Sequence, residues 1–377
     1  MKKFAICLAL VVVLGLAGAA LAEEPIRIGV YLPLTGQNAF GGQLERDGIL
    51  MGNKEKPEVL GRKIEVIVVD NKSDKVEAAN AVVRLIEKEK VHAILGTYGS
   101  SLAMAGGEVS EKAGIPVLGT SCTNPLVTQG KKYYFRACYI DPLQGSAAAK
   151  FAMDVLGAKQ AAVLKDVAQD YSVGLSAYFK RAFEAAGGQV VSDLNYQSGD
   201  QDFTAQLTTI IGQGAEVLFI PSYFAEGAII IKQARELGGT FHIMGADAMD
   251  NPDMITIGGK DIEGFVYSTF PYAPDMPGMS EMAKTFTENW KVQFPDKDPN
   301  ANSAIGYDSY MLLVDAIERA GSTDPEAITK ALAETMNWEG VTGSTTINET
   351  HDAVKPVGFK RVEGGKQVYV GSVIPEM

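Results

Sequence analysis

The chain has 377 residues, and its 34 basic and 46 acidic side chains give a formal net charge of −12 at neutral pH. Nucleic acids and anionic membrane surfaces attract basic proteins, so this acidic balance argues against both as partners. A chain of this length usually folds into two domains. Three cysteines are too few for a disulfide framework, and the sequence leaves open whether Cys122 and Cys138 pair.

The first 22 residues have the pattern of a cleaved export signal. A pair of lysines precedes an uncharged apolar run over 4–16, and Ala20 and Ala22 fit the small-residue rule for cleavage. The run is shorter than the roughly 20 residues that a membrane span needs. Cys7 lies inside the run and not at the cleavage point, so we expect no lipid anchor. The sequence therefore predicts an exported chain without a membrane anchor.

In the first half of the mature chain, short apolar strands alternate with longer helices. Strands are predicted at 26–32, 63–69, 91–95 and 115–118, and helices at 75–88 and 100–113. In the first of these helices, Val76, Ala79, Val83 and Ile86 share one face. The helix after the first loop looks short, because 53–61 is charged and contains proline. This order predicts a parallel sheet with helices on both faces.

The same alternation starts again in the second half. Strands are predicted at 161–164, 189–194, 216–220 and 241–244, and helices at 172–186, 202–212 and 224–237. Gly187 and Gly238 stand where left-handed helix ends belong. The remainder is mostly helical from 279 to 334, followed by short strands at 341–347, 356–362 and 367–372. The chain therefore contains two α/β units without a long linker between them.

The loops that follow the strands are the candidate binding region, because open parallel sheets bind ligands beyond the carboxyl ends of their strands. These loops combine glycine, serine and threonine with single aromatic residues. Ser100 opens a helix, whose free N–H groups can hold an anion, although simple helix capping also explains a serine there. Turn chemistry alone could explain Ser121 and Thr123, and Asp247 could be a helix cap. Their convergence at one sheet edge favours a site.

Signals for an enzyme are missing. None of the three histidines has the spacing of metal ligands, no nucleophile elbow follows a strand, and Gly41–Gly42 lacks the dinucleotide-binding pattern. The sequence therefore predicts a binding protein that is not an enzyme, with no cofactor and no metal.

At this point the whole mature chain resembles the periplasmic leucine/isoleucine/valine-binding protein family, the type I solute-binding proteins of ABC importers. The resemblance rests on six stretches, at 28–36, 114–116, 123–125, 144–151, 200–203 and 306–308. It implies two Rossmann-like lobes with parallel sheets, joined by three crossovers, with the ligand between them. The implied division is lobe 1 over 23–141 and 271–345, and lobe 2 over 142–270 and 346–377.

The resemblance also implies the roles of individual residues. Ser100, Ser121 and Thr123 would bind the carboxylate and amine of an amino acid, and Asp247 would pair with its ammonium. Aromatic residues would form the wall and lid, namely Phe40, Tyr98, Tyr171 and Tyr223. The family commonly has Glu at the position of Asp247, often Ala at that of Ser121 and an aliphatic residue at that of Tyr98. These departures affect the choice of amino acid.

The expected function is therefore capture of an amino acid, branched-chain or another zwitterion, for delivery to the permease of an ABC importer. The chain would be a monomer in the periplasm, since an unanchored binder is useful only in an enclosed compartment. Three alternatives stay open: an enzyme of the same α/β shape, which no motif supports; a sensor that presents its ligand to a receptor; and a ligand that is an amide, urea or short peptide. If Asp166 and Asp170 face the cleft, a polar or cationic ligand becomes plausible.

Overall fold

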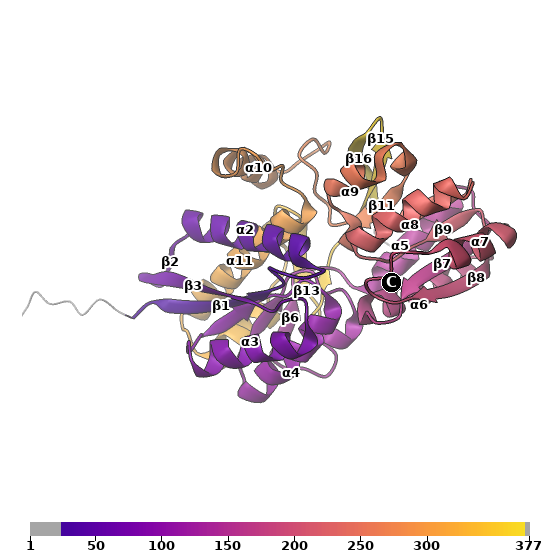
Figure 1. Ribbon diagram of the computed structural model, residues 1–377. Coiled ribbons are helices and arrows are strands. Elements are labelled where there is room, and N and C mark those ends of the chain that lie inside the picture. Colours follow the sequence, from indigo (N-terminus) through magenta and orange to yellow (C-terminus); the bar gives the residue numbers. More distant parts are fainter. Residues whose placement is uncertain (1–23, 374–377) are drawn as a thin grey trace, which may run out of the picture.

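The computed structural model describes residues 24–373, which form two α/β lobes lying side by side (Figure 1). The predicted signal segment over 1–22 lies outside the described residues. Between residues 24 and 373, no helix has the length and apolar character needed to cross a membrane.

The first lobe is built on a six-stranded sheet. Its strands, in spatial order, are β2 (Glu58–Val59), β3 (Arg62–Asp70), β1 (Ile26–Leu32), β4 (Ala93–Leu95), β5 (Val117–Gly119) and β6 (Tyr134–Arg136). All neighbours are parallel except the short edge strand β2. The helices that connect them are α2 (Ala39–Glu55), α3 (Lys75–Glu87) and α4 (Ser100–Ala113). The parallel order aligns the loops after β1, β4 and β5 at one edge.

The second lobe is built on a seven-stranded sheet. Its order is β16 (Lys366–Val373), β15 (Val357–Glu363), β11 (Val266–Thr269), β10 (His242–Gly245), β9 (Val217–Phe219), β7 (Gln160–Asp166) and β8 (Gln189–Tyr196). The strands from β7 to β11 are parallel, whereas β15 and β16 add to the edge antiparallel. Its helices are α5 (Asp141–Asp154), α6 (Asp170–Ala185), α7 (Thr204–Gly212), α8 (Phe224–Glu236) and α9 (Asp253–Gly258). The predicted α/β class is confirmed.

The chain passes between the two sheets three times: after β6, after β11 and before β15. The part between the last two passages holds α10 (Glu281–Gln293), α11 (Ala301–Ala320) and α12 (Pro325–Ala333), followed by a small antiparallel sheet. That sheet contains β12 (Trp338–Gly340), β13 (Gly343–Ile347) and β14 (Ala353–Val354). Because 348–355 contacts first-lobe residues, these contacts favour moving the last boundary of the predicted division from 345 to about 355.

Two predictions about helices were wrong. Helix α2 is not short: it has 17 residues and ends at Glu55, just before Pro57, so its charged last turn remains helical. In α3 the predicted apolar face does not point inward, since the Val76 side chain is 67% exposed. The buried face carries Ala78, Ala81, Val82 and Leu85. Gly29 on β1 makes room for Leu85 there, because a Cβ at Gly29 would lie 3.0 Å from that side chain.

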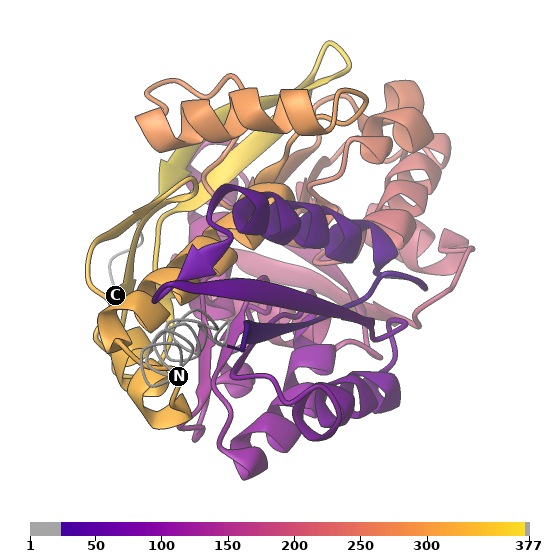
Figure 2. The same cartoon turned by 90° about the vertical axis from the view of Figure 1, so that its left-hand side faces the viewer.

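Helices α2 and α11 cross at very short range through glycines. A Cβ at Gly48 would lie 2.1 Å from the Ser303 carbonyl oxygen, and one at Gly306 would lie 2.3 Å from that of Glu45. Figure 2 shows the orange α11 passing close beneath the indigo α2. The crossing therefore determines the distance between α2 and the edge of the sheet.

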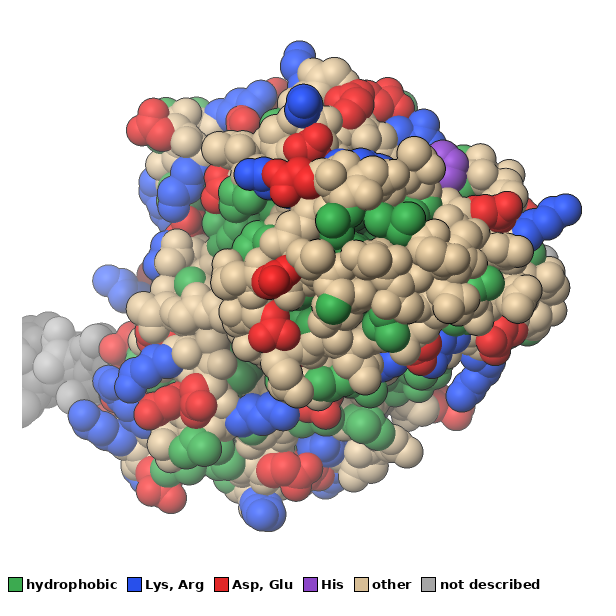
Figure 3. Space-filling view, turned by 45° about the vertical axis from the view of Figure 1, so that its right-hand side comes forward, with side chains coloured by type: hydrophobic (Ala, Val, Ile, Leu, Met, Phe, Trp, Pro, Cys, Tyr) green, Lys and Arg blue, Asp and Glu red, His purple; other side chains and the backbone are tan. Residues whose placement is uncertain are grey.

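The molecular surface mixes charges of both signs. On the face in Figure 3, blue and red side chains alternate and the green apolar ones form small separate groups. Larger apolar side chains lie instead in the core of each lobe.

Candidate functional site

A small cavity lies between the two lobes, at the facing edges of their sheets. It has an empty volume of about 180 Å³ and is lined by Tyr98, Gly99, Ser100, Ser121, Thr123, Tyr171, Tyr223, Asp247 and Ala248. Sequence analysis predicted seven of these nine residues as ligand contacts. The structure brings those seven together from loops that are separated by up to about 150 residues along the chain.

Ser100 lies at the start of α4 but does not cap it. The N-cap is Gly99, with φ of 98°, and no side chain caps the first turn. The Ser100 hydroxyl oxygen accepts a hydrogen bond from the Asn124 backbone N–H at 3.1 Å, so its hydrogen remains available. Uncapped N–H groups and the positive end of a 14-residue helix favour an anion at this wall of the cavity.

Asp247 is buried on the opposite wall, at the end of β10. It begins a short 3₁₀ turn without capping it. Gln144 Nε2 and Tyr171 Oη both donate to Oδ1, at 2.6 and 2.8 Å. Burial raises the pKa of the Asp247 carboxyl, while the hydrogen bonds from Gln144 and Tyr171 limit this rise. This carboxyl is therefore positioned to receive a cation.

Three tyrosines form the aromatic part of the wall. The Tyr98 and Tyr223 ring centroids lie 5.7 Å apart, and those of Tyr171 and Tyr223 lie 5.6 Å apart. Tyr98 comes from the first lobe, and its hydroxyl donates to the Ala248 carbonyl in the second. The rings thus connect the lobes and give the cavity an apolar side.

Phe40, the eighth predicted contact, does not line the cavity. It lies in the first turn of α2 and packs on Phe224, with ring centroids 5.5 Å apart. The Tyr98 ring already fills the space over this turn, since a Cβ at Gly41 would come within 2.4 Å of it. Phe40 therefore contacts the other lobe at the entrance, outside the cavity itself.

Asp166 and Asp170, which would favour a polar or cationic ligand if they faced the cleft, interact with other residues instead. Asp166 accepts hydrogen bonds from Ser198 and from the Ala168 backbone. Asp170 accepts a bond from Ser101 and forms an ion pair with Lys75. Neither acid lines the cavity, so neither is free to select a cationic side chain.

Asp170 instead connects the lobes. Its carboxylate accepts from Ser101 Oγ at 2.8 Å, and its backbone oxygen accepts from Asn124 Nδ2 at 2.9 Å. Gln37 and Glu226 form a further bond between the lobes. These contacts hold the lobes closed over the cavity.

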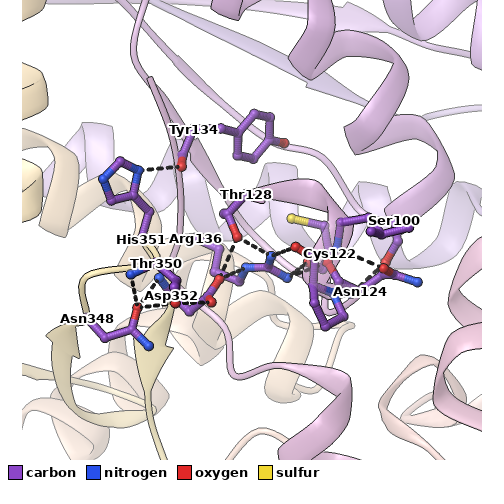
Figure 4. Close-up of polar contacts among 12 residues, drawn as sticks. Ser100, Cys122, Asn124, Thr128, Tyr134, Arg136, Asn348, Thr350, His351 and Asp352 are labelled. Atoms are coloured by element: carbon purple, nitrogen blue, oxygen red, sulfur yellow. Dashed lines mark hydrogen bonds and ion pairs between the residues drawn. The ribbon is translucent and has the colours of Figure 1, made fainter. Parts of the chain in front are cut away.

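Arg136 anchors the loop that carries Ser121, Thr123 and Asn124 (Figure 4). Its Nη1 donates to the carbonyl oxygens of Cys122 and Asn124, at 2.6 and 2.9 Å. The guanidinium also forms an ion pair with Asp352 at 2.7 Å, and both side chains are buried. Asp352 belongs to the third passage between the lobes, so this network ties the loop to the hinge. Nearby Cys122 and Cys138 are buried free thiols.

Sequence analysis missed three polar side chains around the cavity. Glu45 on α2 accepts hydrogen bonds from Ser121 and Thr120. Gln144 holds Asp247, and Asp141, one turn earlier on α5, has two buried oxygens without a hydrogen-bond partner. Each reaches the site from a helix and not from a loop after a strand. A helical periodicity that places an acid on an otherwise apolar face is the signal that could have found Glu45.

Several buried polar atoms beside the cavity also lack a partner. They are Asn38 Oδ1, Tyr139 Oη, both carboxylate oxygens of Asp141, Gln144 Oε1 and Tyr223 Oη. Unpaired buried polar atoms are costly and are rare in folded proteins. Their concentration around one cavity indicates a polar ligand.

Three comparisons with known proteins show the family and the fold of this chain. The profile of the periplasmic binding protein family matches residues 25–367. A leucine-, isoleucine-, valine-, threonine- and alanine-binding protein of Pseudomonas aeruginosa is 28% identical over 90% of each chain.

Two solved structures are similar over nearly the whole chain. A leucine binding protein, LivK, from Thermotoga maritima is 43% identical with a TM-score of 0.90, and the match covers 93% of this chain and 99% of that one. The branched-chain amino acid transporter substrate binding protein LivJ from Streptococcus pneumoniae, in complex with isoleucine, is 28% identical with a TM-score of 0.87. That match covers 93% of this chain and 100% of LivJ.

Proposed function

Because the chain belongs to the periplasmic binding protein family, we propose that it captures a free amino acid between its two lobes and delivers it to an ABC importer. The observation that carries this proposal is the polarity of the cavity. One wall offers the uncapped start of α4, and the other offers the buried carboxyl of Asp247. The two walls suit the carboxylate and the ammonium of a zwitterion.

The roles proposed for the lining residues follow from this polarity. Ser100 and the N–H groups beside it bind the carboxylate, Thr123 and Ser121 complete the polar wall, and Asp247 pairs with the ammonium. The Tyr98, Tyr171 and Tyr223 rings contact the ligand side chain. Asp247 is the one charged residue of the described part among those that line the cavity, so a cavity in which it pairs with the ammonium favours an aliphatic or small polar side chain. Relatives that bind leucine or isoleucine support the branched-chain class.

The small size of the cavity, with about 180 Å³ of empty volume, supports a single amino acid over a short peptide. The remaining parts of the proposal rest on the family: the chain works in the periplasm as a monomer without enzymatic activity, and its partner is the importer's permease.

A thermal-shift screen against the twenty amino acids, common amides and benzoate tests the proposal. A ligand at 100 times its dissociation constant stabilises a protein by about 2.7 kcal/mol. We expect a clear rise in melting temperature with at least one branched-chain amino acid and none with benzoate, which lacks an ammonium. No shift with any amino acid would refute the proposed function.

A further inference from the structure

Glu45 is an acid buried directly behind the cavity wall. It lies on α2, is fully buried, and accepts hydrogen bonds from Ser121 Oγ on one carboxylate oxygen and from Thr120 Oγ1 on the other. The close crossing of α2 and α11 holds it there, because the backbone of Glu45 rests on Gly306. Within residues 24–373, no lysine, arginine or histidine forms an ion pair with it. The roles proposed for the lining residues do not include this carboxyl, although its burial is unfavourable.

The hydrogen-bond partners give the two cavity serines opposite polarity. A serine hydroxyl has one hydrogen and two lone pairs. Ser100 accepts from the Asn124 N–H and keeps its hydrogen for the ligand. Ser121 donates its only hydrogen to Glu45, so it can offer the cavity only its lone pairs. Ser100 therefore suits an anionic group, and Ser121 suits a cationic group.

The charge of Glu45 decides whether this arrangement holds. An ionised Glu45 can only accept, so both hydroxyls must donate to it. A protonated Glu45 carries one hydrogen of its own, which must go to Ser121 or Thr120 because its oxygens face these two hydroxyls. A hydroxyl that receives this hydrogen has to turn its own hydrogen away. Protonation therefore changes what the cavity wall presents when this hydrogen goes to Ser121, because Ser121 lines the cavity and Thr120 does not.

We propose that Glu45 is a positioning residue that turns the lone pairs of Ser121 toward the ammonium of the bound ligand. This inference rests on the proposed function, since it assumes a ligand with an ammonium group. The ligand's positive charge favours the ionised carboxylate, so binding releases a proton from Glu45.

Proton release sets the direction of the pH dependence. Burial raises the pKa of Glu45 to about 8; the hydrogen bonds from Ser121 and Thr120 oppose this rise, and the nearby Cys122 and Asp247 add to it. For a pKa of about 8, the ionised fraction rises from about 3% at pH 6.5 to about three quarters at pH 8.5. Affinity should therefore increase with pH across this range. Cys122, Asp247 and Tyr98 interact electrostatically with Glu45. Asp141 and Asp247 are further titratable groups at the same cavity. A change of wild-type affinity with pH is therefore not enough to assign the effect to Glu45.

The test is calorimetry with L-leucine and L-isoleucine at pH 6.5 and 8.5, on the wild type and on Glu45→Gln. Gln is isosteric, neutral and a donor, so it imitates protonated Glu45. The wild type should bind about 10- to 25-fold more tightly at the higher pH. Glu45→Gln should bind at both values as the wild type does at pH 6.5. Both proteins meet the same ligand, so titration of the ligand amine cancels. An equal pH slope in the two proteins overturns the inference.

A double-mutant cycle with Ser121→Ala separates positioning from a purely structural role. If Glu45 acts through Ser121, Glu45→Gln should raise Kd at pH 8.5 by more than about fivefold in the wild-type background and by less than about twofold beside Ser121→Ala. Equal effects in the two backgrounds overturn the inference. If Glu45→Gln does not fold, Ser121→Ala alone tests the inference. The affinity of this variant should change much less between pH 6.5 and 8.5 than the affinity of the wild type does. Wild-type protein that binds neither ligand at either pH contradicts the proposed function instead.

Discussion

At the scale of single residues, the site depends on burying charge against a matched partner. Asp247 is buried and lines the cavity, and its two side-chain donors both bond Oδ1. We propose that the ammonium of an amino acid pairs with this carboxyl, so that a charge that is costly to bury gains a matched partner in the complex.

Replacing Asp247 by Asn tests this role. The change removes the charge and keeps the shape, so the ammonium loses its ion pair. Breaking a buried charged pair costs about 2–5 kcal/mol, and about 1.4 kcal/mol corresponds to a tenfold change. We expect calorimetry to give a Kd at least about 30-fold higher. Asp253→Asn, which changes an exposed acid a few residues away, is the control and should bind as the wild type does. Unchanged affinity in Asp247→Asn would remove this residue from the site.

How far the sequence predicts the site also becomes clear at this scale. Seven residues that line the cavity were predictable because parallel strands end at one edge and the loops after them must meet there. Phe40 does not line the cavity, because the Tyr98 ring takes the space above Gly41, which no local pattern reveals. Glu45 and Gln144 were missed because they reach the site through hydrogen bonds from neighbouring helices.

At the scale of elements, the predicted strands and helices fell close to those observed, and Ser100–Ala113 is an example. Gly114 ends this helix in the left-handed conformation, a stop signal that the sequence carries locally. The face of α3 was less predictable, because apolar residues occur on two sides and only the sheet decides which side is buried. The depth of α2 is likewise a tertiary property, set by its glycines against α11.

The α2–α11 crossing gives a prediction about stability. In Gly306→Ala the new Cβ would lie 2.3 Å from the Glu45 carbonyl oxygen, so the helices must separate. Overpacking typically costs about 1–3 kcal/mol, and thermal or urea unfolding should show this loss. The matched control is Gly212→Ala in α7, where a Cβ meets nothing within 4 Å. The control should be neutral or slightly stabilising. Equal melting temperatures for the two variants would contradict the close packing.

At the scale of the whole molecule, we propose that binding is coupled to closure of the two lobes. The lobes meet through Asp170, which contacts Ser101 and Asn124 of the other lobe without lining the cavity. Separation of the lobes would break these contacts, so they should add to affinity by favouring the closed form. Closure also removes water from the cavity, which strengthens each polar contact with the ligand.

Asp170→Ala should therefore weaken binding although Asp170 is remote from the ligand. Its ion pair with Lys75 is largely exposed and contributes little, so most of the loss comes from the bond to Ser101. A hydrogen bond to a charged group is worth about 1.5–3 kcal/mol, and we expect Kd to rise by about tenfold. Stopped-flow measurements should place the change mainly in the dissociation rate. A variant that dissociates as slowly as the wild type would show that these contacts do not hold the lobes closed.

We propose that the cavity between the lobes binds both charges of one amino acid. Calorimetric titration with L-leucine and L-isoleucine, alongside their amine and carboxylic acid analogues that each lack one charge, tests this proposal. We predict one ligand per chain for at least one of the two amino acids, and at least about 30-fold weaker binding for either analogue. Binding of a one-charge analogue as tight as that of the amino acid, or binding of neither amino acid, would contradict the claim.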